Sequence, residues 1–111
     1  MINKILEIIF ANKKLEKSFL DIDEDDEVKK GIKKAIKQLK ENPFAGIQIP
    51  KKLIPYEYVK EYGIKNLWKY DLPNGWRLIY SITTPSKIEI ISVIIEWFNH
   101  KNYERKFKYL F

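Results

Sequence analysis

The chain has 111 residues, 45% of them hydrophobic, with no cysteine and a formal net charge of +6. This length predicts a single domain over residues 1–111, and the apolar content excludes a disordered chain. The absence of cysteine excludes disulfides, thiol catalysis and thiolate metal sites, and the positive charge favours an anionic partner such as nucleic acid, although a lysine-rich composition explains it equally well.

The positive charge is concentrated in the second half of the chain. Residues 51–111 carry eleven Lys or Arg against six Asp or Glu, whereas residues 1–50 carry ten Lys and nine acids. No apolar run approaches the roughly 18–20 residues of a membrane-spanning helix, and residues 1–10 lack the pattern of a signal peptide. We therefore expect a soluble, cytoplasmic protein without a membrane partner.

The first predicted elements are a strand and a helix. Residues 5–10 form a short apolar run that fits a strand or the start of a helix. We favour the strand, because Asn12 is then placed to cap a helix over residues 13–21. The buried stripe of that helix is formed by Leu15, Phe19 and Ile22.

An acidic stretch follows, with six acids among residues 21–27. We interpret it as a connector and the first turn of a second helix, where acids favour the helix dipole. The alternative, a calcium loop, requires a glycine and a spaced glutamate that are not placed correctly here. We therefore expect no metal ion and no cofactor.

The second predicted helix covers residues 26–41 and ends at Asn42 and Pro43. Its apolar stripe consists of Val28, Ile32, Ala35, Ile36 and Leu39. Six lysines are predicted to cover the rest of the helix as a solvated face, with a phosphate-binding face as the alternative: Lys29, Lys30, Lys33, Lys34, Lys37 and Lys40.

A loop over residues 43–54 leads to a short helix that begins at Pro55 and is capped by Gly63. Residues 64–71 and 76–83 then form a hairpin around the turn Pro73-Asn74-Gly75, whose residues suit a tight turn.

The third strand of this region, residues 87–98, is apolar on both faces at its centre, so it is predicted to be a central strand covered on both sides. Residues 99–111 follow with the one histidine and a predicted short helix. The fold class is α+β, with two N-terminal helices packed on one face of a small, mostly antiparallel β-sheet. We also expect the first strand to contact the last.

The outgoing hairpin strand contains one cation that is difficult to explain by packing. Alternation places Trp76, Leu78, Tyr80 and Ile82 on one face of the sheet. Arg77 belongs to the other face, with Ile79, Ser81 and Thr83. Arg77 is therefore either a functional residue or the partner of Asp71 or Glu89 across the strands.

Six polar residues are expected near one end of the sheet: Lys69, Arg77, His100, Lys101, Tyr103 and Arg105. Such a set suits metal-free phosphodiester cleavage, in which a ribose 2′-OH attacks its own 3′ phosphate. Arg77 is the candidate for the phosphate, because its planar guanidinium binds two oxygens. His100 is the candidate for proton transfer, and Tyr103 for substrate positioning, stacking or assistance to proton transfer.

Aromatic side chains near this set offer a second kind of contact with RNA. Trp68, Tyr70 and Trp97 are candidates for stacking on single-stranded bases. Packing in the core or on the sheet is the alternative for these rings, and an ordinary surface position is the alternative for His100.

Two segments resemble the RelE/ParE superfamily of type II toxin–antitoxin toxins, particularly its archaeal RelE-like members. Residues 67–80, LWKYDLPNGWRLIY, are similar to the family's hairpin, in which a glycine and an aromatic residue precede Arg-Leu. Residues 97–104, WFNHKNYE, are similar to its His-x-x-Tyr ending, and the order of elements and the helix over 27–43 also match.

The resemblance implies a small basic toxin that cleaves mRNA in the ribosomal decoding site without a metal and is neutralised by an antitoxin. Its partners would be the cognate antitoxin, the ribosome and mRNA. By position, Arg77 falls on the arginine that contacts the scissile phosphate, and His100 and Tyr103 fall on the C-terminal acid/base and aromatic positions. Lys69 would assist, and Lys101 and Arg105 would bind RNA together with Trp68 and Tyr70.

The chain also departs from the family pattern. Family members carry two lysines on the first hairpin strand, whereas here Lys69 is one residue out of that alternation, and Trp68 and Tyr70 occupy the facing positions. Superfamily members of the ParE type poison DNA gyrase and cleave no RNA. A gyrase inhibitor, or an inactive RelE-fold module that binds RNA or protein, is therefore the alternative function.

Overall fold

A five-stranded sheet forms the centre of the computed structural model, which describes residues 4–107. Its strands are β1 (Ile5–Phe10), β2 (Ile47–Gln48), β3 (Trp68–Asp71), β4 (Arg77–Thr83) and β5 (Glu89–Phe98). They lie in the order β1-β5-β4-β3-β2, and every pair is antiparallel except β1 with β5. The predicted α+β class and the contact between the first and last strands are confirmed.

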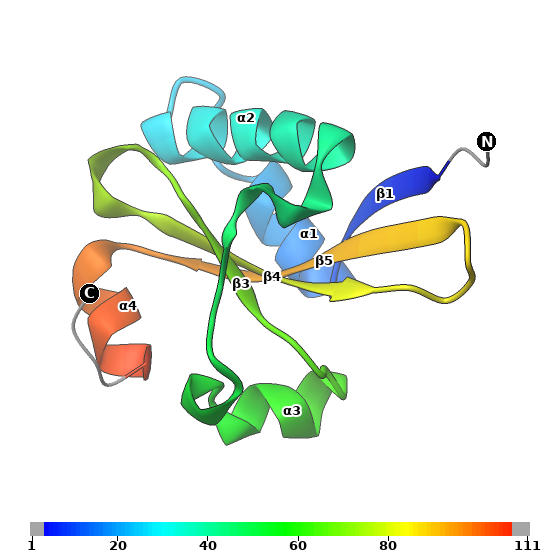
Figure 1. The fold of residues 1–111 in the computed structure, drawn as a ribbon. Coiled ribbons are helices and arrows are strands. Elements are labelled where there is room, and N and C mark those ends of the chain that lie inside the picture. The colour runs from blue at the N-terminus through cyan, green and yellow to red at the C-terminus, as the bar shows by residue number, and fades with distance from the viewer. Residues whose placement is uncertain (1–3, 108–111) are drawn as a thin grey trace.

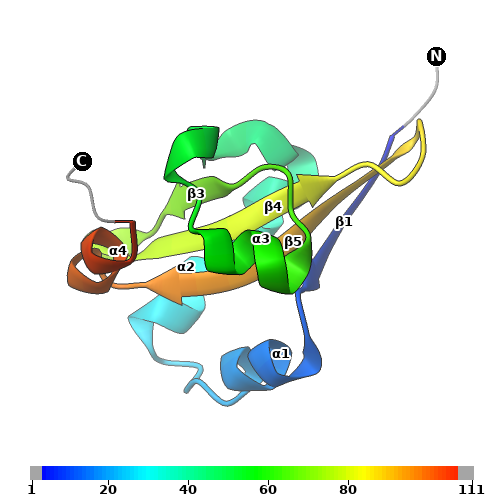
Figure 2. The same cartoon turned by 90° about the horizontal axis from the view of Figure 1, so that it is seen from below.

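Helices cover both faces of this sheet. Figure 1 shows α2 (Glu27–Glu41) above the sheet and α3 (Tyr56–Tyr62) below it. In Figure 2, which is seen from below, α3 lies in front of the sheet, α2 lies behind it, and α1 (Lys13–Leu20) lies beside it, next to the end of β1. The helix α4 (His100–Phe107) follows directly after β5, as the predicted terminal helix. The end of that prediction, residues 108–111, lies outside the described residues.

Local capping explains where the helices begin and end. The Asn12 side chain accepts a hydrogen bond from the Leu15 amide (2.8 Å), and Asp26 caps α2 by accepting from Val28 (2.7 Å). Gly63 ends α3 with φ 64°, a conformation that glycine adopts without steric cost. The predicted caps Asn12 and Gly63 are confirmed, whereas Asp26, predicted as the first residue of the second helix, is its cap. Pro55 immediately precedes α3 instead of opening it.

The structure contains a strand that the sequence pattern does not predict. Residues 47 and 48 lie in the predicted loop, yet they pair with Trp68 and Lys69 as β2. A strand of two residues has no detectable alternation, so only its neighbour reveals it. The predicted strand over 64–71 is also shorter, because only its second half, β3, is regular strand.

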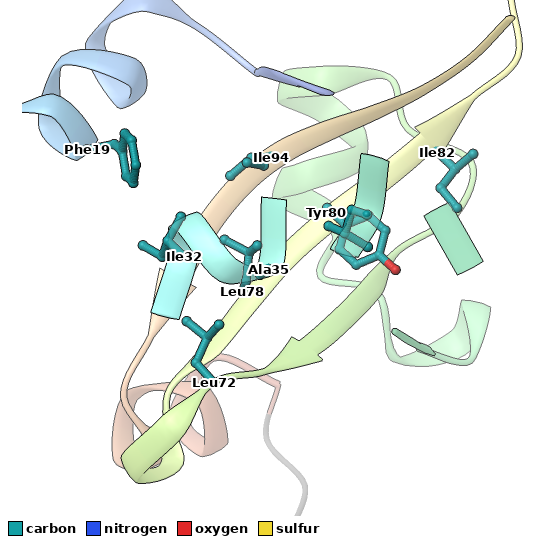
Figure 3. Close-up of a cluster of buried hydrophobic side chains, with 9 residues drawn as sticks. Phe19, Ile32, Ala35, Leu72, Leu78, Tyr80, Ile82 and Ile94 are labelled. Carbon is teal, nitrogen blue, oxygen red and sulfur yellow. The ribbon is translucent and has the colours of Figure 1, made fainter. Parts of the chain in front are cut away.

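The two faces of the sheet carry separate hydrophobic clusters. Leu78, Tyr80 and Ile94 from β4 and β5 pack against Phe19, Ile32 and Ala35 of the helices α1 and α2 (Figure 3). On the other face, the cluster combines α3, α4 and the strands: Ile49, Tyr58, Leu67, Ile79, Ile95, Tyr103 and Phe107. The strands β4 and β5 are therefore covered on both sides, as predicted for residues 87–98.

Tyr80 joins the first cluster to the loop after α2. Its hydroxyl donates a hydrogen bond to the Pro43 carbonyl (2.8 Å) and accepts one from the Gly46 amide (3.1 Å). A Cβ at position 46 would lie 2.5 Å from both the Tyr80 hydroxyl and the Lys69 carbonyl oxygen. The loop therefore needs both the glycine and the hydroxyl.

Replacing Tyr80 by phenylalanine is expected to lower the free energy of unfolding by about 1–2 kcal/mol, because a buried carbonyl and a partly buried amide lose their partner. Burial also raises the pKa of Tyr80 from 10.0 to about 12. The stability that the protonated phenol contributes is thus present below pH 10 and is lost as the pH rises toward 12. Urea unfolding at pH 7 and across this alkaline range should show the lower stability and a weaker alkaline loss in the variant. Equal stability of the two proteins at pH 7 would contradict the assigned hydrogen bonds.

The position of Lys29 differs from the one predicted for the lysines of α2. Only 1% of the surface of Lys29 is exposed to solvent. Its ammonium donates hydrogen bonds to the carbonyls of Phe19 (2.9 Å), Leu20 (3.2 Å) and Ile22 (3.1 Å). These carbonyls lie at and just beyond the C-terminal end of α1, where backbone acceptors lack helical partners and the helix dipole is negative. Lys29 therefore belongs to the interior, and its assignment to the solvated face was wrong. The other five lysines of this set are exposed.

Candidate functional site

The candidate site lies where the β3–β4 hairpin meets α4. The hairpin turn holds Asn74 at φ 61° and Gly75 at φ 78°, the left-handed conformations expected of an Asn-Gly turn. A Cβ on Gly75 would lie 3.3 Å from the Cβ of His100. The glycine therefore allows the first residue of α4 to approach the first residue of β4, which is Arg77.

Arg77 is held on three sides and is mostly buried, with 13% of its side chain exposed. Its Nη1 donates to the Gly75 carbonyl (2.7 Å), and its Nη2 lies 3.4 Å from Nδ1 of His100. Its Nε lies 3.0 Å from Oδ1 of Asp71, its register partner on β3, but it makes no hydrogen bond with it. The contact with Asp71 is therefore an ion pair without a hydrogen bond, and it realises one of the two pairings that the sequence left open.

Lys69 lies beside Arg77, on the same face of the sheet. Its ammonium is 3.2 Å from Oδ1 of Asp71, so both cations contact one carboxylate oxygen. Lys69 Nζ and Arg77 Cζ also lie 5.8 Å and 5.4 Å from the centre of the Tyr103 ring, which is buried beneath them. The expectation that Trp68 and Tyr70 occupy the positions that face the site was wrong, because Lys69 shares the face of Arg77 and these two rings lie on the other face.

The two ring nitrogens of His100 have different partners. Nε2 lies 2.5 Å from Oε1 of Glu104, one turn later on α4, and Nδ1 faces Arg77. A guanidinium has only donors, so the neutral ring that fits these partners carries its proton on Nε2 and directs the Nδ1 lone pair at Arg77. We assign this tautomer from the hydrogen-bond partners. The ring is half exposed, so water and ligands can reach it.

The remaining candidates fall into two groups. Lys101 and Arg105 are exposed on α4. Trp68 and Tyr70 lie on the opposite face of the sheet, packed against the cluster that α1 and α2 cover. The Trp68 ring stacks on Tyr80 with a 6.2 Å separation of ring centroids. The structure thus brings together Lys69, Arg77, His100 and Tyr103, and it does not bring Trp68 or Tyr70 to them.

Glu104 is a site residue that the sequence reasoning missed. The signal was present, because residues four apart on a helix lie on one face and a carboxylate there can orient an imidazole. Asp71 was considered only as a structural partner of Arg77. The structure shows that its half-exposed carboxylate contacts both Lys69 and Arg77, so an external anion would have to displace it in order to contact both cations.

Comparison with known families shows to which family the chain belongs. The model of the family described as "ParE toxin of type II toxin-antitoxin system, parDE" matches residues 9–95. The chain belongs to this family. This ParE-family chain is a type II toxin, as the resemblance to the RelE/ParE superfamily implied, and membership implies an antitoxin partner.

The range that the family model matches covers only part of the candidate site. It contains the cations of the hairpin, Lys69 and Arg77, but it ends before α4, which carries His100 and Tyr103. Searches of curated proteins and of solved structures gave no match. Among residues 4–107, no helix combines the length and apolarity that crossing a bilayer requires.

Replacing Asp71 by asparagine is expected to tighten the binding of inorganic phosphate about threefold to tenfold, because a charged competitor at the two cations is removed. Titration followed by the NMR signals of the Lys69 and Arg77 side chains measures the dissociation constant. Glu41→Gln, a change at an exposed residue of α2, is the matched control. Equal phosphate affinity in wild type and the Asp71 variant would show that the carboxylate does not occupy an anion site.

Proposed function

We propose that this toxin is a ribosome-dependent mRNA endonuclease that works without a metal ion. The observation that carries the proposal is the contact between Arg77 and His100, at 3.4 Å between Nη2 and Nδ1. It places a fixed guanidinium, which can bind a phosphate, beside an imidazole lone pair, which can accept a proton. Each of these is what cleavage of a ribose phosphodiester by its own 2′-OH requires.

In the proposed reaction, the 2′ oxygen forms a bond to phosphorus as the bond from phosphorus to the 5′ oxygen breaks. Nδ1 of His100 accepts the 2′-OH proton, and a proton from the resulting imidazolium or from water reaches the leaving 5′ oxygen. Arg77 and Lys69 stabilise the charge on the phosphate oxygens after the phosphate has displaced the Asp71 carboxylate from them. The products are a 2′,3′-cyclic phosphate and a free 5′-OH.

The other residues have supporting roles in this proposal. Tyr103 is 1% exposed, so its ring supports Lys69 and Arg77 from below and does not contact the substrate in this arrangement. Glu104 fixes the tautomer of His100. The exposed cations Lys101 and Arg105 extend the positive surface along α4 toward the mRNA or ribosomal RNA backbone.

Inhibition of DNA gyrase is the second candidate function. It is favoured by the family match itself, because the matching model is named for ParE toxins and ends before the His100 helix. In that case the hairpin and its cations would form a protein-binding surface, and RNA would remain intact. Both candidate targets lie in the cytoplasm, so either function places the toxin there, together with its antitoxin.

The test is a translation reaction with a defined mRNA, with and without the purified toxin, in which new mRNA ends are mapped. The nuclease proposal expects cuts within the decoding site, only in the presence of ribosomes, that leave a 2′,3′-cyclic phosphate. A parallel supercoiling reaction with purified gyrase tests the alternative. Intact mRNA together with inhibited supercoiling would replace the nuclease proposal by the gyrase function.

A further inference from the structure

The strand β1 presents a free edge along one side of the molecule. It is the outermost strand of the sheet, and within residues 4–107 its one strand partner is β5. Figure 1 shows it projecting at the right of the sheet, away from α3 and α4. Two large apolar residues of this strand remain exposed, Ile5 at 46% and Ile9 at 45%.

The hydrogen-bond pattern shows which backbone groups of β1 are unused. The amide of Ile5 donates to the carbonyl of Ile88 (2.5 Å), just before β5, and the amide of Ala11 donates to the carbonyl of Ile94 in β5 (2.8 Å). In a parallel ladder, residues of the same parity direct both N–H and C=O to one neighbour. The amides and carbonyls of Leu6, Ile8 and Phe10 therefore point outward, where no strand of the described chain meets them.

The opposite edge of the sheet is protected in a way that β1 is not. The strand β2 has only two residues, and Pro43 and Pro50 stand close on either side of it. Short length and nearby prolines are the usual devices that prevent an edge from pairing with another chain. The β1 edge is a run of six residues with no proline, and its single charge is Glu7. It is therefore the edge of this sheet that is suited to an added strand.

Glu7 determines what kind of strand fits. It lies between Ile5 and Ile9 on the same face of β1, and its side chain makes no ion pair or hydrogen bond within the described residues. The nearest cation along the chain, Lys4, is turned toward the Lys87 carbonyl (2.5 Å). An added antiparallel strand would place its own residue directly opposite Glu7 in a non-hydrogen-bonded pair, where side chains approach most closely.

A second copy of this chain fits the edge poorly. A two-fold antiparallel pair of β1 strands centred on position 7 would set Glu7 against Glu7, and like charges directly opposite each other are destabilising. A pair centred on Leu6 or Ile8 would instead set Glu7 against Ile5 or Ile9. Neither register gives the carboxylate a partner.

We propose that the β1 edge binds one extended strand of a partner protein in which a Lys or Arg stands between two apolar residues at alternate positions. The cation pairs with Glu7, the two apolar residues pack on Ile5 and Ile9, and the partner backbone bonds the outward groups of Leu6, Ile8 and Phe10. The antitoxin that family membership implies is the natural source of such a strand. The proposal does not depend on whether the toxin cleaves RNA or inhibits gyrase.

The test uses the full chain and a seven-residue peptide, threonine-valine-threonine-lysine-threonine-valine-threonine, at millimolar concentration. Hydrogen exchange followed by NMR should slow at the amides of Leu6, Ile8 and Phe10. The amides of Glu7 and Ile9 serve as internal controls, because they already bond β5. No slowing at the three outward amides, or the same slowing in the free protein as its concentration rises, would overturn the proposal.

Reversing the charge of the peptide and of residue 7 tests whether Glu7 selects the added strand. A second peptide carries glutamate in place of the lysine, and a variant carries Glu7→Lys, a change at an exposed residue that preserves the fold. The wild type should bind the lysine peptide about threefold to tenfold more tightly than the glutamate peptide, and the variant should reverse this preference. An unchanged preference in the variant would show that Glu7 does not select the strand.

Discussion

Replacing Lys29 by methionine is expected to lower the free energy of unfolding by about 3 kcal/mol. Methionine keeps the apolar stem over the Phe19 ring, which the Lys29 ammonium approaches to 4.5 Å, but it removes the donor to three carbonyls. The Leu20 and Ile22 carbonyls lose this donor near the end of α1, whereas the Phe19 carbonyl keeps the hydrogen bond from the Ile22 amide (3.2 Å). Glu24 also loses a partner, because the hydrogen bonds from Lys33 and then Lys29 lower its pKa.

Urea unfolding and thermal melting measure this effect. For a chain of this size a loss of 3 kcal/mol corresponds to a fall in the melting temperature of about 15 °C. The matched control is Lys30→Met, the same change one residue later on the exposed face of α2, which should stay within about 0.5 kcal/mol of wild type. Equal stability of the two variants would mean that the Lys29 ammonium does not cap α1.

Replacing Arg77 by alanine is expected to reduce the rate of ribosome-dependent mRNA cleavage about 100-fold to 1000-fold, the usual loss when a donor to developing charge is removed. The side chain is fixed by the Gly75 carbonyl and Asp71 before any substrate arrives, so little reorganisation is needed at the transition state. Primer extension on the cleaved mRNA, under single-turnover conditions, gives the rate. Arg77→Lys should also be slow, because an ammonium cannot hold two phosphate oxygens as a planar fork does.

The control for the Arg77 variants is Lys60→Ala, which removes one exposed cation from α3 and leaves the site untouched. Its cleavage rate should match that of wild type, and thermal melting should show that every variant remains folded. A folded Arg77→Ala protein that cleaves mRNA at the wild-type rate would remove Arg77 from the proposed reaction. Loss of gyrase inhibition with no RNA cleavage by either protein would assign the residue to the alternative function.

Much of the secondary structure follows from short-range patterns. Asn12 and Asp26 are capping residues and occupy the caps, and Gly63 ends a helix with positive φ. The turn Pro73-Asn74-Gly75 forms where the sequence places it. These features depend on the conformational preferences of one residue and its nearest neighbours, so the sequence is sufficient to predict them.

The candidate site was predicted only in part. Alternation on β4 correctly separates Arg77 from Leu78 and Tyr80, because a strand has a period of two. The same reasoning on β3 should have placed Trp68 and Tyr70 away from Arg77. Their role as base-stacking residues was inferred from residue type, whereas the structure uses the Trp68 ring to cover Tyr80.

The sequence by itself determined the caps, the turns, the two-fold alternation of β4 and, through the family match, the toxin class. The tertiary structure decided that Lys29 is buried, although its spacing of three and seven residues from Ile32 and Ile36 already placed it on the inner stripe. It also decided that α4 sets His100 against Arg77 across the hairpin turn. The physical reason is that local patterns fix the conformation within one element, whereas a contact between distant elements depends on how those elements pack.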